Sequence, residues 1–200
     1  MRLGINGAIF LLCGFLLGCT QEREVTGPWQ LDNEQSRLSF VSTKAVDVSE
    51  VHRFSELSGS VSVAGEARVA VELASVDTLI PIRDERMREL LFETQTFPQA
   101  SLAANVDIDG YLAMPAGSSL ATSEQIMVNM RGISAAFSVD VLVTKVAADR
   151  FVVASLQPIL VSADTFGLSD GVEALRAVAG LPSIGGSVPV SFVLSFVRLP

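Results

Sequence analysis

Strict alternation of apolar and polar residues is the feature that most constrains the fold of this chain. In residues 67–73, ARVAVEL, the odd positions are apolar and two of the even positions carry Arg68 and Glu72. In residues 188–196, VPVSFVLSF, the even positions form the larger and more consistently apolar set. A period of two places alternate side chains on opposite faces of a strand, so both segments predict half-buried β-strands.

Similar alternation recurs along the chain at the spacing of a meander. The dipeptide Asp109-Gly110 lies between two apolar stretches, and it predicts the tight turn of a β-hairpin. About eight strands with alternating faces predict an all-β fold, which is either a sandwich or a barrel. The other alternating segments are residues 38–40, 61–63, 135–145 and 151–161.

Two segments follow a helical period instead. Residues 84–91 have apolar Met87, Leu90 and Leu91 on one face, and they predict a short amphipathic helix that begins at a capping Asp84. Residues 170–179 predict a second short helix. Helices of this kind on an all-β scaffold cover an end or an edge of the sheet, so we expect one or two of them at the mouth of a barrel.

The start of the chain reads as an export signal with a lipid attachment site. The apolar run of residues 8–17 has about half the length that a membrane span needs, and Arg2 precedes it. Residues 16–19, LLGC, resemble a bacterial lipobox, in which the Cys is lipidated and the chain is cut before it. We therefore expect a lipoprotein signal peptide (1–18), a lipidated tether (19–28) and a β-barrel domain (29–200). The alternative is an ordinary secretory signal that contains a Cys.

Lipidation of Cys19 would anchor the protein to a membrane without spanning it. In the lipoproteins that this start resembles, a residue other than Asp after the Cys accompanies outer-membrane delivery, and Thr20 fits that pattern. We expect a periplasmic protein that is anchored to the outer membrane through Cys19. The other cysteine, Cys13, would leave with the signal, so no thiol would remain for a disulfide, a metal site or a nucleophile.

The composition argues against several classes of function. The net charge of −8 disfavours binding to nucleic acid. The chain has one histidine, His52, which we expect on the surface or in a strand, and it has no cluster with metal-ligand spacing. We therefore predict no metal site, no catalytic residues and no cofactor other than a possible bound lipid. The hydrophobic content of 49% exceeds what a small core requires, so some apolar surface is available to line a cavity.

The segment of residues 74–102 resembles the YceI-like family, the lipid- or polyisoprenoid-binding proteins of bacterial periplasms. Further matches, such as Trp29 to Asp32 and Asp164 to Gly167, extend the resemblance over nearly the whole mature chain. Departures such as Gln35-Ser36, where the family has His-Ser or His-Thr, leave the ligand open. Within residues 74–102 the matched positions are Ser75, Val76, Thr78, Arg83, Asp84, Met87, Arg88, Phe92, Phe97 and Pro98.

The resemblance implies an antiparallel, lipocalin-like barrel with an isoprenoid tail, of a quinone or a polyprenyl lipid, in its interior. It also implies structural roles for Arg83 and Asp84, which we expect to pair with each other or to cap the helix, and a solvated position for Arg88 or a contact with a lipid headgroup. The expected ligand-binding residues share an apolar side chain that faces the lumen or its mouth: Phe40, Phe54, Val69, Val71, Leu73, Met87, Phe92, Phe97, Leu102, Phe137, Phe166, Phe192, Leu194 and Phe196.

Three classes of function stay open on the sequence alone. The first is an anchored binding protein for such a lipid. The second is an envelope stress or structural lipoprotein whose barrel is filled by its own side chains and holds no ligand. The third, an enzyme that acts on such lipids, lacks a visible acid–base pair or nucleophile. The sequence also leaves open whether the protein forms a homodimer.

Overall fold

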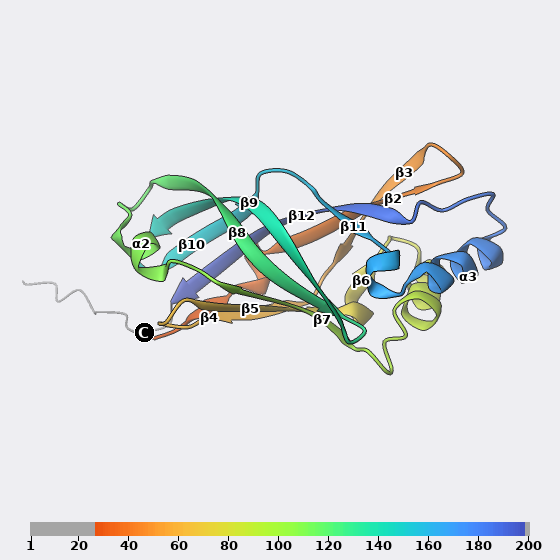
Figure 1. Ribbon diagram of the computed structural model, residues 1–200, viewed down its shortest axis with the longest axis horizontal. Coiled ribbons are helices and arrows are strands. Elements are labelled where there is room, and N and C mark those ends of the chain that lie inside the picture. The colour runs from red at the N-terminus through yellow and green to blue at the C-terminus, as the bar shows by residue number, and fades with distance from the viewer. Residues whose placement is uncertain (1–26, 199–200) are drawn as a thin grey trace, which may run out of the picture.

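The alternating segments form the strands of one antiparallel sheet, which closes on itself into an elongated barrel (Figure 1). The computed structural model describes residues 27–198. Within that part, eight strands make up the closed ring, because β12 pairs with both β10 and β1. The expected antiparallel barrel of about eight strands is confirmed. In ring order the strands are β1 (Trp29–Leu31), β4 (Leu57–Val61), β5 (Glu66–Glu72), β7 (Gln99–Asn105), β8 (Ser119–Met130), β9 (Ile133–Ala147), β10 (Arg150–Ser155) and β12 (Ser187–Arg198).

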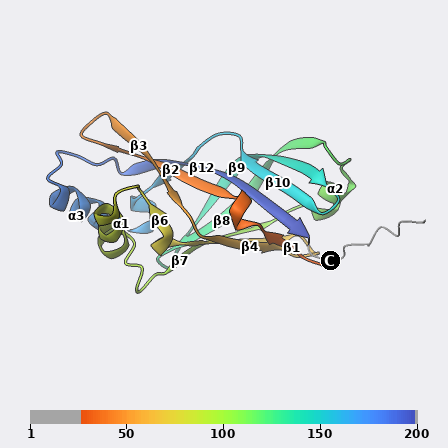
Figure 2. The ribbon, with the colours of Figure 1, turned by 180° about the vertical axis from the view of Figure 1, so that it is seen from behind.

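Four further strands extend the sheet at one end of the barrel. The last residues of β12 pair with β1, whereas residues 190–193 of β12 pair with β2. The hairpin of β2 and β3 continues beyond the ring, as both side views show (Figures 1 and 2). The four strands are β2 (Arg37–Lys44), β3 (Val48–Phe54), β6 (Val76–Asp77) and β11 (Ile159–Ser162).

A short 3₁₀ turn over Asn33–Gln35 separates β1 from β2, so the two act as one interrupted strand beside β12. Buried Ser36 satisfies the backbone at this break. Its hydroxyl donates to the carbonyl oxygen of Asp32 (2.7 Å) and accepts from the amide of Ser195 (3.0 Å). Arg150 donates to the Ser195 hydroxyl (2.9 Å) and to the Asp32 carboxylate (3.2 Å). These contacts hold the first strand and the last strand in register.

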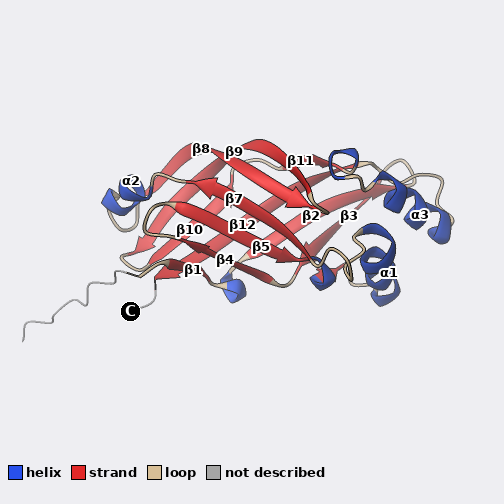
Figure 3. Ribbon diagram, turned by 60° about the horizontal axis from the view of Figure 1, so that its bottom comes forward, coloured by secondary structure: helices blue, strands red, loops and turns tan. Residues whose placement is uncertain are grey.

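The helices lie at the two ends of the barrel (Figure 3). One end carries α1 (Pro81–Arg86), the π-helical turn η3 (Met87–Leu91) that continues it, and α3 (Ser169–Ala179). The other end carries α2 (Ile108–Ala113). Within residues 27–198, no helix combines the length and the apolar character that crossing a bilayer would require. Two further 3₁₀ turns span Leu73–Ser75 and Asp164–Phe166.

Two local predictions are wrong. Asp109-Gly110 is not a hairpin turn but part of α2, because the side chain of Asp107 caps that helix by accepting from the Gly110 amide (3.0 Å). The helix predicted from residue 84 begins at Pro81, since proline fits the first position of a helix, where its missing N–H leaves no bond unmade. Asp84 therefore lies inside the helix and does not cap it.

The buried apolar side chains form two clusters along the barrel axis. One cluster lies toward α2 and includes Trp29, Val141 and Phe151, with the Trp29 and Phe151 rings edge to face at 5.0 Å. The other lies beneath α1 and α3 and includes Leu73 and Phe166, which are both completely buried. The barrel interior is thus lined mainly by apolar side chains along its length.

Candidate ligand-binding lumen

Two apolar cavities lie in the barrel interior, one behind the other. The outer cavity has a volume of about 200 Å³ and lies at the end that carries α1 and α3. The inner cavity has a volume of about 110 Å³ and extends toward α2. Gly185 and Gly186 line the outer cavity and are exposed, so the lumen reaches the surface beside the loop that precedes β12. We call this opening the mouth.

A constriction separates the two cavities. Leu102 of β7, Ile126 of β8 and Phe192 of β12 line both of them. Leu102 and Ile126 come from neighbouring strands and Phe192 from a strand farther around the ring, and all three lie where the two cavities adjoin. An elongated apolar ligand that filled both cavities would have to pass between the side chains of Leu102, Ile126 and Phe192.

Most of the side chains expected in the lumen line these cavities. Met87 and Phe97 do not: Met87 is buried beside the outer cavity, and the half-buried ring of Phe97 lies under the Arg131 guanidinium at 5.4 Å. The residues on the inner cavity are Val69, Leu194 and Phe196, those on the outer cavity are Phe40, Phe54, Val71, Leu73, Phe92, Phe137 and Phe166, and those on both are Leu102 and Phe192.

Other lining residues were not singled out from the sequence. Their signal was present, because Val139, Val141 and Val143 alternate along β9, but the length of this strand obscured which of its residues reach the lumen. Trp29 and Phe151 also line the inner cavity; Trp29 belonged to a matched family segment but was not named as a lumen residue, and Phe151 carried no motif of its own. The alternation of apolar residues therefore identified the inward faces of the strands. How deep each residue lies along the lumen follows only from the closed ring.

The inner cavity contains one polar pair. The hydroxyl of Tyr111, on α2, donates to the carboxylate of Glu124, on β8. Burial is the main cause that raises the pKa of Tyr111, and its hydrogen bond to Glu124 raises it further. The phenol therefore stays protonated and remains a donor at neutral pH. Among the described lining residues, the only other polar side chain is Ser101.

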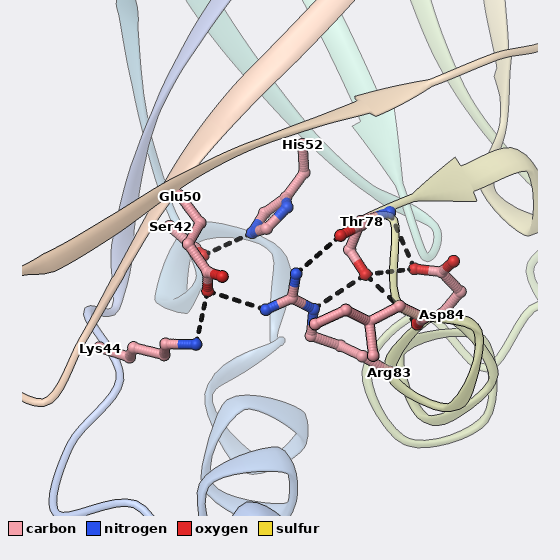
Figure 4. Close-up of polar contacts among 8 residues, drawn as sticks. Ser42, Lys44, Glu50, His52, Thr78, Arg83 and Asp84 are labelled. Carbon is pink, nitrogen blue, oxygen red and sulfur yellow. Dashed lines mark hydrogen bonds and ion pairs between the residues drawn. The ribbon is translucent and has the colours of Figure 1, made fainter.

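The face of β2 and β3 that points into the lumen changes from apolar to polar toward the mouth. The pair Leu38 and Phe54 is apolar, and Phe40 lies opposite His52 one step farther along. The next pair on the same face is Ser42 and Glu50. Polar residues thus begin where the apolar lining ends, and one of them, Glu50, contacts α1. These polar residues are Ser42, Lys44, Glu50 and His52 (Figure 4).

Arg83 connects α1 to this polar face. Its guanidinium pairs with the Glu50 carboxylate (2.8 Å), which also binds the Lys44 ammonium (2.6 Å). The hydrogen bond from Lys44 is the main cause that holds the pKa of Glu50 below its ordinary value, and Arg83 lowers it further. The expected pairing of Arg83 with Asp84 is wrong, because Glu50 is the partner that the sheet presents.

Asp84 instead fixes the loop before α1. Its carboxylate accepts from the amide of Thr78 (2.9 Å) and from the Thr78 hydroxyl (2.5 Å). Arg83 donates to the same hydroxyl and to the Thr78 carbonyl oxygen, each at 2.8 Å. Half-buried Arg88 donates to the Ala74 carbonyl oxygen at 3.5 Å. The three motif residues therefore hold the helix and its loop in place.

His52 is buried, contrary to the alternative of a surface position. Its Nε2 lies 2.8 Å from the Ser42 hydroxyl, and its Nδ1 has no hydrogen-bond partner within residues 27–198. Burial is the main cause that lowers its pKa, and the nearby Arg83 guanidinium lowers it further. The imidazole is therefore neutral at pH 7.

Comparison with known proteins places these features in context. The model of the YceI-like domain matches residues 29–196. The polyisoprenoid binding domain from Saccharophagus degradans, which is implicated in plant cell wall breakdown, is 36% identical, with a TM-score of 0.84 over 86% of this chain and 98% of that one. No curated protein sequence matches the chain.

Two more distant structures share the fold. BcnA of Burkholderia cenocepacia is 19% identical, with a TM-score of 0.63 over 82% of this chain and 98% of that one. The YceI protein of Campylobacter jejuni is 12% identical, with a TM-score of 0.55 over 74% of this chain and 85% of that one.

Proposed function

Because this chain belongs to the YceI-like domain family, we propose that it is a binding protein that holds an apolar, isoprenoid-type lipid in its lumen. The observation that carries the proposal is the pair of cavities in one apolar interior, with volumes of about 200 and 110 Å³. The similarity to a polyisoprenoid binding domain, at 36% identity, supports the same class of ligand. A quinone or a polyprenyl lipid fits this description.

The energetics favour such a ligand over water. A buried water molecule needs about two to four polar partners, and the described lining offers few polar side chains. An apolar chain that leaves water for this interior gains roughly 25 cal/mol per Å² of buried surface. No charged group is needed for that gain, and we therefore propose binding rather than catalysis.

The competing proposal is an envelope stress or structural lipoprotein with a barrel filled by its own side chains. The two cavities speak against a filled barrel, because a closely packed interior leaves few voids larger than a water molecule. Organic extraction of the purified protein followed by mass spectrometry tests the two proposals. We expect an isoprenoid lipid in the extract, and uptake of a polyprenol probe by delipidated protein in native mass spectrometry. A bare chain that takes up neither a polyprenol nor a quinone probe would reject the binding proposal.

We further propose that the protein resides in the periplasm and is anchored to the outer membrane through lipidated Cys19. Cys19 lies outside the described residues, and the support is the LLGC sequence at residues 16–19. Replacing Cys19→Ser should abolish lipid attachment and leave the barrel folded. Mass spectrometry of the N-terminal peptide and membrane fractionation of both forms provide the test. An acyl-modified peptide from the Cys19→Ser protein, or an unmodified one from the parent, would contradict the proposal.

A further inference from the structure

The mouth of the lumen is surrounded by apolar side chains that project into solvent. Three segments contribute, and each also lines the outer cavity: the β2–β3 hairpin through Phe40, the loop before α1 with α1 and η3 through Leu91, and α3 through Val172. We call the exposed set the apolar rim, and it consists of Val46, Val48, Leu79, Ile80, Ile82 and Val178.

Two members of the apolar rim are held in an unfavourable backbone conformation. Val46 is 84% exposed and has φ of 81°, and Leu79 is 82% exposed and has φ of 62°. They are the two most exposed large apolar side chains among residues 27–198. Left-handed backbone is costly for a β-branched residue, whereas Gly or Asn adopts it readily. Neither the exposed apolar side chains of these two residues nor their left-handed backbone stabilises the fold. They therefore indicate a contact with something outside the chain.

The hairpin tip of the apolar rim lies next to the loop that forms the mouth. The amide of Gly185, which lines the outer cavity, donates to the Thr43 carbonyl oxygen (2.7 Å), and the amide of Ala45 donates to the Ser183 carbonyl oxygen (3.0 Å). The hairpin tip with Val46 is thus hydrogen-bonded to the loop that forms the mouth. A lipid that leaves the lumen over this loop passes beside the hairpin tip that carries Val46, which lies beyond the polar pair Ser42 and Glu50.

We propose that the apolar rim docks on the surface of a lipid bilayer, so that the ligand passes between bilayer and lumen without crossing water. This inference rests on the proposed lipid-binding function. Transfer of an apolar chain through water is unfavourable in proportion to its exposed surface, and a docked rim removes that exposure. Lys44 and Arg83 share the single carboxylate of Glu50, which offsets one of their two charges, so attraction to anionic lipid is reduced. A neutral bilayer is therefore a sufficient partner.

If the chain is cleaved before Cys19, as proposed above, its own N-terminal segment is too short to occupy the apolar rim. Gly27 lies at the other end of the barrel, where its carbonyl oxygen accepts from Arg198 at the end of β12 (2.6 Å). The eight Cα–Cα steps from a cleaved N-terminus at Cys19 to Gly27 reach at most about 29 Å. The twelve residues of β12, which run from the mouth end to this point, span about 40 Å. The apolar rim would therefore face away from the membrane that holds the anchor.

A two-vesicle experiment tests the proposal. The full chain is reconstituted through its N-terminal segment into donor vesicles of phosphatidylcholine, and protein-free acceptor vesicles of the same lipid carry a second fluorophore. We expect energy transfer between the two populations to show that the protein bridges them. The double variant Val46→Asn, Leu79→Asn should bridge at least about tenfold less, because two inserting side chains become polar. Its melting temperature should be unchanged or higher, because Asn tolerates the left-handed backbone.

A matched control and two opposing outcomes make the test decisive. Val63→Asn removes a comparable exposed side chain, 63% exposed, from the β4–β5 turn at the α2 end, and it should bridge as the parent does. Equal bridging by parent and double variant would overturn the proposal. A second result would also overturn it: the parent does not bridge vesicles but forms dimers in detergent, and the double variant does not form them. The apolar rim would then join two copies of the chain. Polyprenol uptake, measured in parallel, separates failure of docking from failure of lipid binding.

Discussion

A single substitution tests whether the barrel interior is an open cavity or a packed core. Val71 lines the outer cavity, whereas Arg68, three residues earlier on the same strand, is exposed on the outer face. Replacing Val71→Trp should fill volume that a lipid tail needs. In a cavity the larger ring is accommodated, so we expect a folded protein that has lost uptake of a polyprenol probe. Thermal melting and native mass spectrometry of parent and variant give the two readouts.

The control for this substitution is Arg68→Trp on the outer face of β5, which should leave uptake unchanged. If Val71→Trp instead destabilised the protein by the cost of overpacking, about 1–3 kcal/mol, and the parent bound no probe, the interior would be a packed core.

The single histidine gives the protein a pH dependence with a definite sign. Arg83 and Asp84 from α1, Lys44 from β2, and Glu50 from its own strand act on His52. The pKa of His52 in the folded protein lies below the ordinary value of 6.5. In the pH range between the folded-state pKa and 6.5, the folded state therefore binds fewer protons than the unfolded state. The free energy of unfolding should therefore fall as the pH drops below about 6.5.

Denaturant unfolding of the parent and of His52→Gln between pH 7 and pH 5 measures this effect. The chain has no other histidine, so the variant should lose most of the slope. Parallel curves for the two proteins would show that the imidazole is not the responsible group.

At the scale of elements, the loop before α1 depends on one carboxylate. Asp84→Ala should leave the buried amide and hydroxyl of Thr78 without their acceptor, at a cost of about 1–3 kcal/mol. Hydrogen exchange in residues 78–91 should accelerate relative to the strands of the ring. Glu85→Ala, at an exposed position of the same helix, is the control and should leave exchange nearly unchanged. Equal protection in Asp84→Ala and parent would contradict the assigned role.

The elements themselves were predictable to the extent that their signals are local. The period of two identified β5 and β12 and the faces they turn inward, and the period of 3.6 identified α3. The start of α1 was missed because Asp84 resembles a helix cap, whereas the helix begins three residues earlier at Pro81. The helix α2 was missed because Asp109-Gly110 resembles a hairpin turn, whereas Asp107 caps a helix there through the Gly110 amide. The salt bridge from Arg83 to Glu50 joins segments 33 residues apart, and no local pattern reveals it.

At the scale of the whole molecule, the lumen is divided, and this division should set the length of the ligand. Phe192→Trp should narrow the passage at the constriction, so that short polyprenol probes still bind in the outer cavity and long ones are excluded. Val193→Trp, which lies on the outward face of the same strand and is 41% exposed, is the matched control. Native mass spectrometry with a series of chain lengths reads the result. Identical length profiles for Phe192→Trp and parent would show that the inner cavity does not receive the tail.

The closure of the ring through β12 has a consequence for the order in which the protein folds. Among the described strands, β12 follows all the others in the chain, and it pairs with β1 and β2, the first two, across 150 or more residues. Such distant pairings make folding slow, on the scale of milliseconds to seconds for β-barrels and sandwiches. The ring therefore cannot close while the C-terminal residues are still being made. A growing chain of this protein therefore exposes unpaired, apolar strands until β12 has been made.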